Sequence, residues 1–338
     1  MSGEAPVSDP IPNLLGRDLT AEEQALRAAL ERAFDSSAIL CNLGPALRQL
    51  VSRAPTAFCA AVLSVLPSLK DPVRRHLYES AAECREFWIE LFRAGSFSRP
   101  QLLQVCRYFM TIENLLDVRL ARLTSGRRCD DGQLDSETTV RILDLLDELS
   151  SGNRLILLLN HLTRHPDCRI AAKATLLVGR RLRNPDWVAD HLDSKDGRVR
   201  ASTVEGLWGS RSPATRNSLW ASLNDKNNRV VGNALIGLHQ IGEPGVNEFL
   251  KRMIEDSRPP FRWTAAWVMG QIGAEVFLED LERALRDKEA HVQRAAERAL
   301  EAILHRDSTD AAASPHSSGT DIETRQPSPL TPRDTAGT

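Results

Sequence analysis

Apolar residues in the second half of the chain recur at a fixed spacing of 31 residues. One such column contains Cys168, Val199, Val230, Phe261 and Val292. The residues four and eight positions further on are small or apolar, and they are Ala172, Thr203, Ala234, Ala265 and Ala296, then Leu176, Leu207, Leu238, Met269 and Leu300. The columns 11 and 7 positions before the first are Leu157, Val188, Leu219, Leu250 and Leu281, then His161, Leu192, Leu223, Ile254 and Leu285. Self-similarity at a period of roughly 20 to 50 residues indicates a stack of structural repeats.

Each repeat is predicted to be a pair of helices. The columns lie three or four positions apart within a turn, so they line one face of each of two helices, for example residues 199–207 and 215–223. The small residue four positions into the first helix, such as Ala234, allows two helix backbones to approach closely. One pair cannot bury its apolar face alone, and neighbouring pairs are therefore expected to stack around a shared core.

Polar residues follow the same period in the loops between repeats. Acidic residues stand five positions before the first apolar column, and these are Asp225, Asp256 and Asp287. Arginine stands one position after it at three repeats, Arg169, Arg200 and Arg262, with Val231 and Gln293 at the other two. Aspartate just before a helix can also cap it. These charges are predicted to form either a ladder between neighbouring repeats or solvated ion pairs, each of which contributes ~0–1 kcal/mol.

This arrangement resembles the HEAT-repeat family, in the short bacterial version of about 30 residues that is shared with phycobilin-lyase-type repeats. The resemblance rests on Asp225-x4-Val230, Asp256-x4-Phe261-Arg262 and Asp287-x4-Val292, each followed by alanine four positions later. It covers about half of the chain and implies an all-α, right-handed superhelix, that is, a HEAT-like solenoid. It also implies a scaffold that binds other proteins.

The first 130 residues are predicted to be helical, but they do not fit the 31-residue period. Thr20 and Glu23 have the spacing of a capping box at a helix start. Apolar residues at helical spacing predict long helices over residues 71–92 and 98–124. Residues 136–149 resemble a first repeat helix, with Val140 standing 28 rather than 31 positions before Cys168.

A polar, turn-rich stretch at residues 124–135 is the expected boundary between two parts of the chain. The predicted organisation is a flexible N-terminus (1–17), an irregular helical region (18–130), a HEAT-like solenoid (131–305) and a disordered tail (306–338). The tail is rich in Ser, Thr, Pro, Asp and Gly, so it has too little apolar surface to offset the entropy lost on ordering.

Composition limits the class of protein to which the chain can belong, but it does not identify a function. Of 338 residues, 42% are hydrophobic and only 5% are aromatic, which suits close packing of helices. The net charge of −2 provides no general attraction to nucleic acid or to an acidic membrane. Six scattered cysteines without a C-x-x-C pair, no signal sequence and no long apolar run predict a cytoplasmic protein with reduced thiols and no membrane span. The Arg-, Ala- and Leu-rich, Lys-poor composition suggests a bacterial origin.

No catalytic, cofactor-binding or metal-binding constellation is predicted. His161, His165 and Cys168 have a spacing that metal ligands can have, but Pro166 breaks the helix and no further ligand completes a shell. Phosphate-binding glycine loops and the G-x-S-x-G motif are absent. HEAT-like hydroxylases of a modified lysine carry repeated His-Glu pairs for iron, and this sequence has no His-Glu dipeptide.

Tryptophans supply candidate contacts, since five of the six fall within residues 187–267. Trp263 and Trp267 lie one turn apart and outside the buried columns. Trp220 is expected to project from the second helix of its repeat, the helix that usually lines the concave surface of HEAT-like solenoids. The predicted partner-binding residues are Arg216, Trp220, Lys251, Arg252, Trp263 and Trp267, because tryptophan and arginine dominate binding energy at interfaces. The alternative is that these tryptophans pack against neighbouring repeats.

The predicted function is a non-enzymatic scaffold or adaptor that binds another protein. One alternative is a HEAT-like DNA-binding protein or alkylpurine DNA glycosylase, and another is a phycobilin-lyase-like chaperone or enzyme. A cleft for DNA should be basic, because phosphate contacts dominate affinity. The expected concave positions carry both signs of charge, so nucleic acid is not predicted to be the partner.

Overall fold

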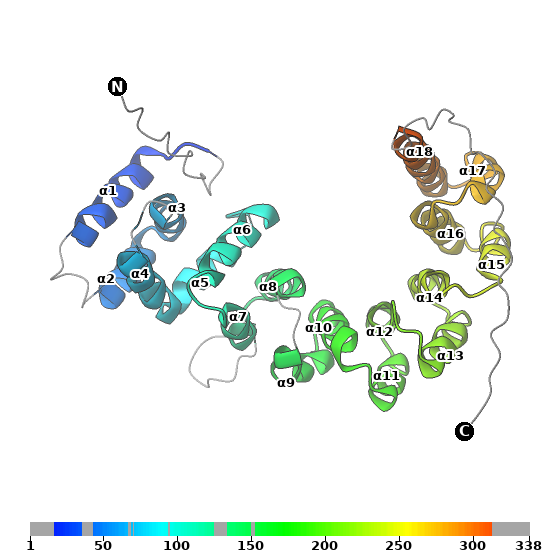
Figure 1. Cartoon of the computed structure of the whole chain (residues 1–338), viewed down its shortest axis with the longest axis horizontal. Coiled ribbons are helices and arrows are strands. Elements are labelled where there is room, and N and C mark those ends of the chain that lie inside the picture. The colour runs from blue at the N-terminus through cyan, green and yellow to red at the C-terminus, as the bar shows by residue number, and fades with distance from the viewer. Residues whose placement is uncertain are drawn as a thin grey trace, which may run out of the picture.

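The computed structural model is a series of helices stacked into an open arc. It describes residues 17–35, 43–66, 69, 71–93, 95–124, 134–149 and 153–312, and no strand occurs within these ranges. Figure 1 shows the arc running from α1 through α8 and α10 to α18. The predicted all-α superhelix is confirmed. Within the same ranges, no helix combines the length and the apolar character needed to cross a membrane.

The N-terminal part contains α1 (Ala21–Asp35), α2 (Leu43–Arg53), α3 (Pro55–Val65), α4 (Asp71–Glu83), α5 (Arg85–Phe92), α6 (Arg99–Met110) and α7 (Leu116–Thr124). The capping box at α1 is confirmed: Thr20 N donates to Glu23 Oε2 at 2.8 Å, and Glu23 N donates to Thr20 Oγ1 at 3.3 Å. The two long helices predicted here are each divided. Cys84 leaves the helical backbone conformation (φ −88°, ψ 95°) between α4 and α5, and a turn after Met110 separates α6 from α7.

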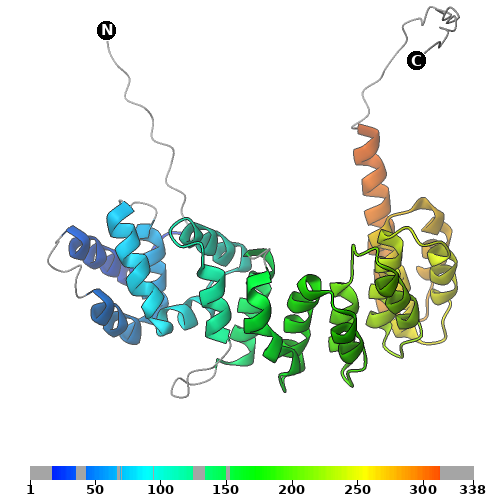
Figure 2. The same cartoon turned by 60° about the horizontal axis from the view of Figure 1, so that its bottom comes forward.

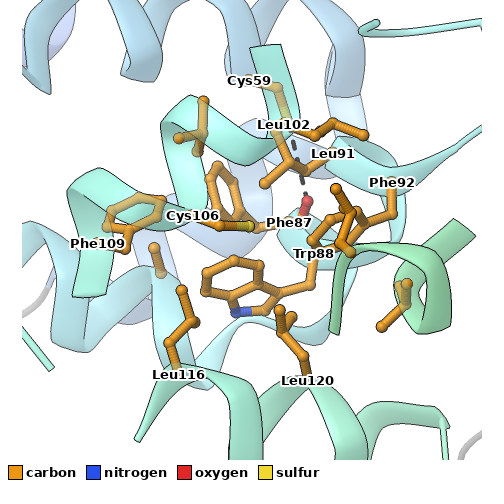
Figure 3. Packing of buried hydrophobic residues seen from close by; sticks show 14 of the residues in the cluster. Cys59, Phe87, Trp88, Leu91, Phe92, Leu102, Cys106, Phe109, Leu116 and Leu120 are labelled. Atoms are coloured by element: carbon orange, nitrogen blue, oxygen red, sulfur yellow. Dashed lines mark hydrogen bonds between the residues drawn. The ribbon is translucent and has the colours of Figure 1, made fainter. Parts of the chain in front are cut away.

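Aromatic residues fill the core of this part. Figure 3 shows Trp88 of α5 surrounded by Cys106 and Phe109 of α6 and by Leu116 and Leu120 of α7. The rings of Trp88 and Phe109 meet edge to face at 5.6 Å between centroids. Cys59, Cys84 and Cys106 are buried free thiols, and burial raises the pKa of Cys106 to about 12. These three are reduced core thiols as predicted, whereas Cys41 and Cys129 lie outside the described residues.

The repeat part alternates first and second helices. The first helices are α8 (Ser136–Leu149), α10 (Cys168–Leu182), α12 (Gly197–Gly206), α14 (Asn228–Gln240), α16 (Pro259–Ile272) and α18 (Ala290–Ala312). The second helices are α9 (Ile156–Leu159), α11 (Pro185–Leu192), α13 (Pro213–Ser222), α15 (Val246–Met253) and α17 (Leu278–Ala284). The first helix is the longer of its pair except for α12 and α13, which have 10 residues each. Short 3-10 helices flank α9, η3 (Asn153–Leu155) before it and η4 (Asn160–Arg164) after it, and η5 (Glu275–Phe277) precedes α17. Figure 2 shows that α18 extends beyond its neighbours.

The first helices form the inner side of the arc, and the second helices form the outer side (Figure 1). Each first helix packs directly on the next, from α10 to α12 and onward to α18. Small residues allow this contact: a Cβ added to Gly206 would lie 3.2 Å from the Gly179 backbone, and one added to Gly270 would lie 2.9 Å from Ala299 Cα. The expectation that the second helices line the concave surface is therefore wrong, because the closest helix-to-helix spacing lies along the first helices.

The first copy of the repeat is two residues out of the predicted register. Asp167 caps α10 through Arg169 N, and Asp196 caps α12 through Arg198 N, which places equivalent residues 29 positions apart. Ile170 is therefore the buried counterpart of Val199, and Cys168 is only partly buried. Further upstream, Leu159 is buried, whereas Leu157, assigned to the core by the 31-residue spacing, is 84% exposed. The reason is that the chain between the cap of α10 and the buried Val188 of α11 is two residues shorter than the equivalent stretch from the cap of α12 to Leu219 of α13.

The arginine–aspartate ladder forms between two pairs of neighbouring repeats. Arg200 Nε and Nη2 donate to the two carboxylate oxygens of Asp225 at 2.7 and 2.8 Å, while Nη1 donates to Ser194 O at 2.8 Å. Arg262 repeats this geometry on Asp287 at 2.6 and 2.8 Å. These arginines are largely buried, so the alternative of solvated pairs is wrong at both rungs. Where Val231 replaces the arginine, Asp256 pairs with Arg258 of its own loop instead.

The buried residues form two large clusters that meet between α10 and α12. The first runs from Leu30 to Val178, and the second from Val188 to Ile303. The first cluster continues without a break from the N-terminal helices into α8 and α10, across the stretch predicted to divide the chain at residues 124–135. The hydrophobic core thus joins the irregular helices to the first repeats. The predicted disordered tail begins at residue 306, whereas α18 continues to Ala312. Residues 1–16 and 313–338 lie outside the described residues.

Candidate protein-binding surfaces

Trp263 and Trp267 lie on the inner face of the solenoid. On α16, the buried residues Phe261, Ala265 and Met269 face the core. Trp263 and Trp267 follow Phe261 by two and six positions, which places them on the opposite side of the helix. Because α16 is an inner helix, that side faces the hollow of the arc. Both indoles are partly buried against the second core cluster, and each keeps part of its surface accessible.

The hydrogen bonding of the indole N–H group distinguishes these two tryptophans from the other three in the repeat part. Trp187 Nε1 donates to Asn160 Oδ1 at 3.1 Å, Trp208 Nε1 to Asn233 O at 2.8 Å, and Trp220 Nε1 to Glu243 Oε2 at 3.1 Å. Within the part of the chain that the structure describes, no such partner exists for Trp263 or Trp267. A half-exposed indole with a free N–H can receive both apolar contact and a hydrogen bond from a partner.

Two arginines on the next inner helix extend this surface. Arg294 and Arg298 of α18 follow Trp263 and Trp267 by 31 residues and are exposed. We call Trp263, Trp267, Arg294 and Arg298 the inner patch. The sequence reasoning missed both arginines, although the repeat period applied to the two tryptophans would have found them. Tryptophan and arginine together have the composition of an interaction hot spot.

The other predicted contacts lie on the outer helices. Arg216 and Trp220 of α13 both bind Glu243, which precedes α15: Arg216 Nε lies 2.8 Å from Glu243 Oε1. Glu243 is mostly buried, so its two partners tie α13 to the following loop. This contact was not foreseen, because it depends on a loop residue 23 positions from Trp220.

Lys251 and Arg252 project from α15 on the same outer side. Lys251 Nζ lies 4.0 Å from Asp280 of α17, with nearly half of its side chain exposed. The Arg252 guanidinium lies 5.7 Å from the Phe249 ring centroid, and its Nε donates to Glu248 O at 3.3 Å. The structure thus places the six predicted residues in two groups, Trp263 and Trp267 inside the arc and the other four outside it.

Charged side chains cross the inner face between α8, α10 and α12. Arg180 of α10 donates to both oxygens of Asp147 on α8 at 2.8 and 2.7 Å, and to Glu205 on α12 at 3.0 Å. Lys173 adds a contact of 2.6 Å to Asp144. Burial raises the pKa of Glu205, although Arg180 opposes that shift. These pairs neutralise one another, so this stretch of the inner face presents little net charge.

The residues considered as metal ligands have other partners. His165 Nδ1 accepts a hydrogen bond from Asp167 N at 3.0 Å, and Cys168 Sγ lies 2.7 Å from Arg198 Nη1. His161 is exposed. Among the described residues, no group of three or more His, Cys, Asp or Glu side chains is arranged to hold a metal ion.

Comparison with known proteins supports the repeat assignment. A model of HEAT repeats matches residues 223–301, which include α14 to α17 and most of the α18 core contact. Residues 223–301 are HEAT repeats. The solenoid is accordingly HEAT-like, and its regular copies coincide with the part of the sequence that follows the 31-residue period most closely.

Curated relatives match only segments of the chain. A protein of Geobacillus stearothermophilus described as uncharacterized, in the gldA 3' region, is 28% identical over 99 residues, or 29% of this chain and 39% of that protein. Epoxyqueuosine reductase of Bacillus subtilis is 28% identical over 105 residues, or 30% of this chain and 23% of the enzyme. The match therefore spans less than half of either relative. Two crystal structures of engineered proteins align with TM-scores of 0.27 and 0.23 at 15% identity, which is too distant to inform the fold.

Proposed function

We propose that the chain is a scaffold that binds a protein segment on the inner face of α16 and α18, with Trp263 and Trp267 as anchors. The observation that carries the proposal is the pair of partly buried indoles whose N–H groups lack partners among the described residues, beside the exposed Arg294 and Arg298. The segment is expected to offer apolar side chains for the rings and carbonyl or carboxylate oxygens for the N–H groups. HEAT repeats in residues 223–301 support this kind of role.

The four predicted residues on the outer helices offer a second, weaker contact surface. Arg216, Trp220, Lys251 and Arg252 offer charge and an aromatic ring, but Glu243 already binds Arg216 Nε and the indole N–H of Trp220. A partner would have to displace Glu243 to use them, which costs the hydrogen bonds that join α13 to the next loop. Trp220 is therefore a suitable control position for a test of the inner patch.

The test begins with site-specific photo-crosslinking in the native host, from position 267 on the inner face and from position 216 on the outer face. The partner recovered at position 267 is then purified, and its affinity is measured by calorimetry for the wild type, Trp263→Ala/Trp267→Ala and Trp220→Ala. The inner variant is expected to bind at least about tenfold more weakly, because a hot-spot residue contributes ~2 kcal/mol or more. The Trp220 variant is expected to bind within about threefold of wild type, a difference below ~1 kcal/mol.

Circular dichroism of each variant controls for folding, and Trp263→Phe/Trp267→Phe provides a milder change that retains the rings but removes both N–H groups. Equal binding by the wild type and both inner variants would reject the inner patch. Duplex DNA serves as a separate ligand, since DNA affinity would fall steeply with salt and respond to Arg294 and Arg298 rather than to the indoles. Turnover of a substrate or a bilin-type absorbance band in the purified protein would instead favour the enzyme or phycobilin-lyase-like alternatives.

A further inference from the structure

Each complete rung of the ladder defines a place for one guanidinium group. Arg200 and Arg262 both reach the carboxylate at the equivalent position of the next repeat, Asp225 or Asp287. Their Nη1 atoms also donate to carbonyls of their own loop, six and five positions earlier in the chain. A guanidinium has five N–H donors in a rigid plane, and this place surrounds it with oxygen acceptors.

The rung is missing between α10 and α12. In the register set by the caps Asp167 and Asp196, Ala171 takes the position of Arg200, and Ser194 takes the position of Asp225. A cavity of about 370 Å³ lies there instead, and Ala171 and Ser194 are part of its lining. The corresponding cavity beside α17 measures about 260 Å³ and is lined by the Arg262–Asp287 rung itself. The larger cavity is thus a ladder position without its arginine.

The same cavity contains acceptors that a guanidinium could use. His165 and Pro166 line it, and they stand six and five positions before Ala171, as Ser194 and Lys195 stand before Arg200. Asp190 and Asp196 contribute carboxylates, and the cations Arg164 and Lys195 balance them. Arg164 lies on the surface, with 78% of its side chain exposed, and pairs with Asp190 at 3.0 Å, so it does not fill the space.

His191 provides an independent sign that a group is missing. Its side chain lines the cavity and is only 5% exposed. Nδ1 lies 2.8 Å from Trp187 O, and a carbonyl can only accept, so Nδ1 carries a proton; in the neutral imidazole, Nε2 is then an acceptor. Nε2 is buried and has no partner among the described residues. An unpaired buried acceptor destabilises the fold, and a donor that reaches it from outside would remove that cost.

We propose that this cavity binds the guanidinium of an arginine side chain from a partner protein. The partner arginine would donate to His191 Nε2 and to the loop carbonyls, and so complete the rung that the chain leaves open at Ala171. Its charge would lie close to the Asp190 and Asp196 carboxylates. The site is on the loop edge between α10 and α12, apart from the inner patch on α16 and α18, and the proposal does not rest on that patch.

The test uses the full chain and the probe N-acetyl-arginine amide, with N-acetyl-citrulline amide as the matched neutral control. The ¹⁵N resonance of His191 Nε2 is followed by NMR as each compound is added, and His191→Ser identifies the resonance. Serine is chosen because Ser222 occupies the corresponding buried position in the next repeat. The arginine compound is expected to shift the Nε2 resonance saturably at millimolar concentration, and the citrulline compound is expected to bind more weakly because it lacks the charge.

Two variants examine the same site in opposite ways. Ala171→Arg/Ser194→Asp rebuilds the rung within the chain; it is expected to raise the urea midpoint of unfolding and to weaken the arginine compound at least about tenfold, or 1.4 kcal/mol. His191→Ser removes the acceptor and is expected to weaken binding of the compound without filling the cavity. Because this variant lacks the His191 resonance, its binding is compared with that of the wild type through the backbone amide resonances of Ala171 and Ser194, which line the cavity. Either variant, if folded, decides the question. No saturable shift in the wild type, or equal binding to a folded variant and the wild type, would overturn the proposal.

Discussion

Arginine side chains in this solenoid have two environments that differ in burial. Arg262 has 14% of its side chain exposed and spans two repeats through Asp287, which is 11% exposed. Arg169 is 56% exposed and pairs with Asp167 of its own loop. A charge pair that is largely withdrawn from water and holds several hydrogen bonds stabilises more than an exposed pair, which solvent screens. The position of an arginine relative to the next repeat therefore decides its energetic role.

Replacing Arg262 by glutamine, the residue found at the equivalent position 293, is expected to lower the free energy of unfolding by about 2 kcal/mol, because Asp287 loses its charged donor. Arg169→Gln is the matched control and is expected to leave the free energy of unfolding nearly unchanged, because solvent screens the exposed Arg169–Asp167 pair. Urea unfolding followed by circular dichroism measures both. Similar losses for the two variants would contradict the difference in burial.

Acid is expected to weaken the same rung. Hydrogen bonds from Arg262 lower the pKa of Asp287, and burial opposes them. A carboxylate whose pKa is lower in the folded state stabilises the fold above its unfolded value, ~3.9, and this contribution is lost as pH falls through the folded value. The difference in unfolding free energy between wild type and Arg262→Gln should therefore shrink between about pH 5 and pH 2. A difference that is constant or grows on acidification would show that the pair is not responsible.

Helices in the repeat part are held by contacts between small residues at fixed places. On α14, a Cβ added to Gly232 would lie 2.5 Å from Thr264 Cγ2 of α16, and the next nearest atom is Val268 Cγ2 at 3.5 Å. Asn228 Nδ2 of α14 also donates to Thr264 Oγ1 at 2.7 Å. Thr264 therefore sets the distance between α14 and α16 through its methyl group and joins them through its hydroxyl.

Gly232→Ala is expected to lower the free energy of unfolding by about 1–3 kcal/mol through overpacking, despite the better helix propensity of alanine. Thr264→Ser removes the clashing methyl group but keeps the hydroxyl that Asn228 uses. In that background, Gly232→Ala is expected to be neutral or stabilising. Thermal unfolding of the two single variants and the double variant tests this, and additive losses in the double variant would rule out the proposed clash.

Among the described residues, the buried apolar side chains form two large clusters, and a separate small cluster of Ala171, Ala172 and Val199 lies between α10 and α12. The ladder lacks its rung at the same junction, since Ala171 stands where arginine is found in the next repeat. Ion pairs of Arg180 and the close approach of Gly179 and Gly206 still connect α10 with α12. Repeat proteins unfold according to the strength of such nearest-neighbour contacts, so this junction is expected to be the weak point.

Hydrogen exchange followed by mass spectrometry is expected to resolve two cooperative units under native conditions, one ending in α10 and one beginning with α12. Their opening free energies should differ, and Ala171→Arg/Ser194→Asp should bring the two values closer by adding a rung across the junction. A single opening free energy for peptides from both sides in the wild type would contradict the division.

The sequence by itself determined the fold class and the helix pairs, and it placed the charged residues of the ladder at repeating positions. The reason is that spacing along a helix decides which side chains share a face, and this is a local property of the chain. The period also placed Trp263 and Trp267 outside the fully buried columns of α16. It misplaced Leu157 and Cys168, because a loop two residues shorter shifts the register without altering the apolar character of either position.

Only the tertiary structure decided which helices line the hollow of the arc and which polar atoms are already in use. Curvature follows from how closely neighbouring first helices approach, and that depends on pairs such as Gly179 with Gly206 that lie in different repeats. The pairing of Trp220 with Glu243, and the unpaired Nε2 of His191, likewise depend on loops folding back onto helices. Such contacts join residues that no local spacing relates, so the sequence pattern alone could not assign them.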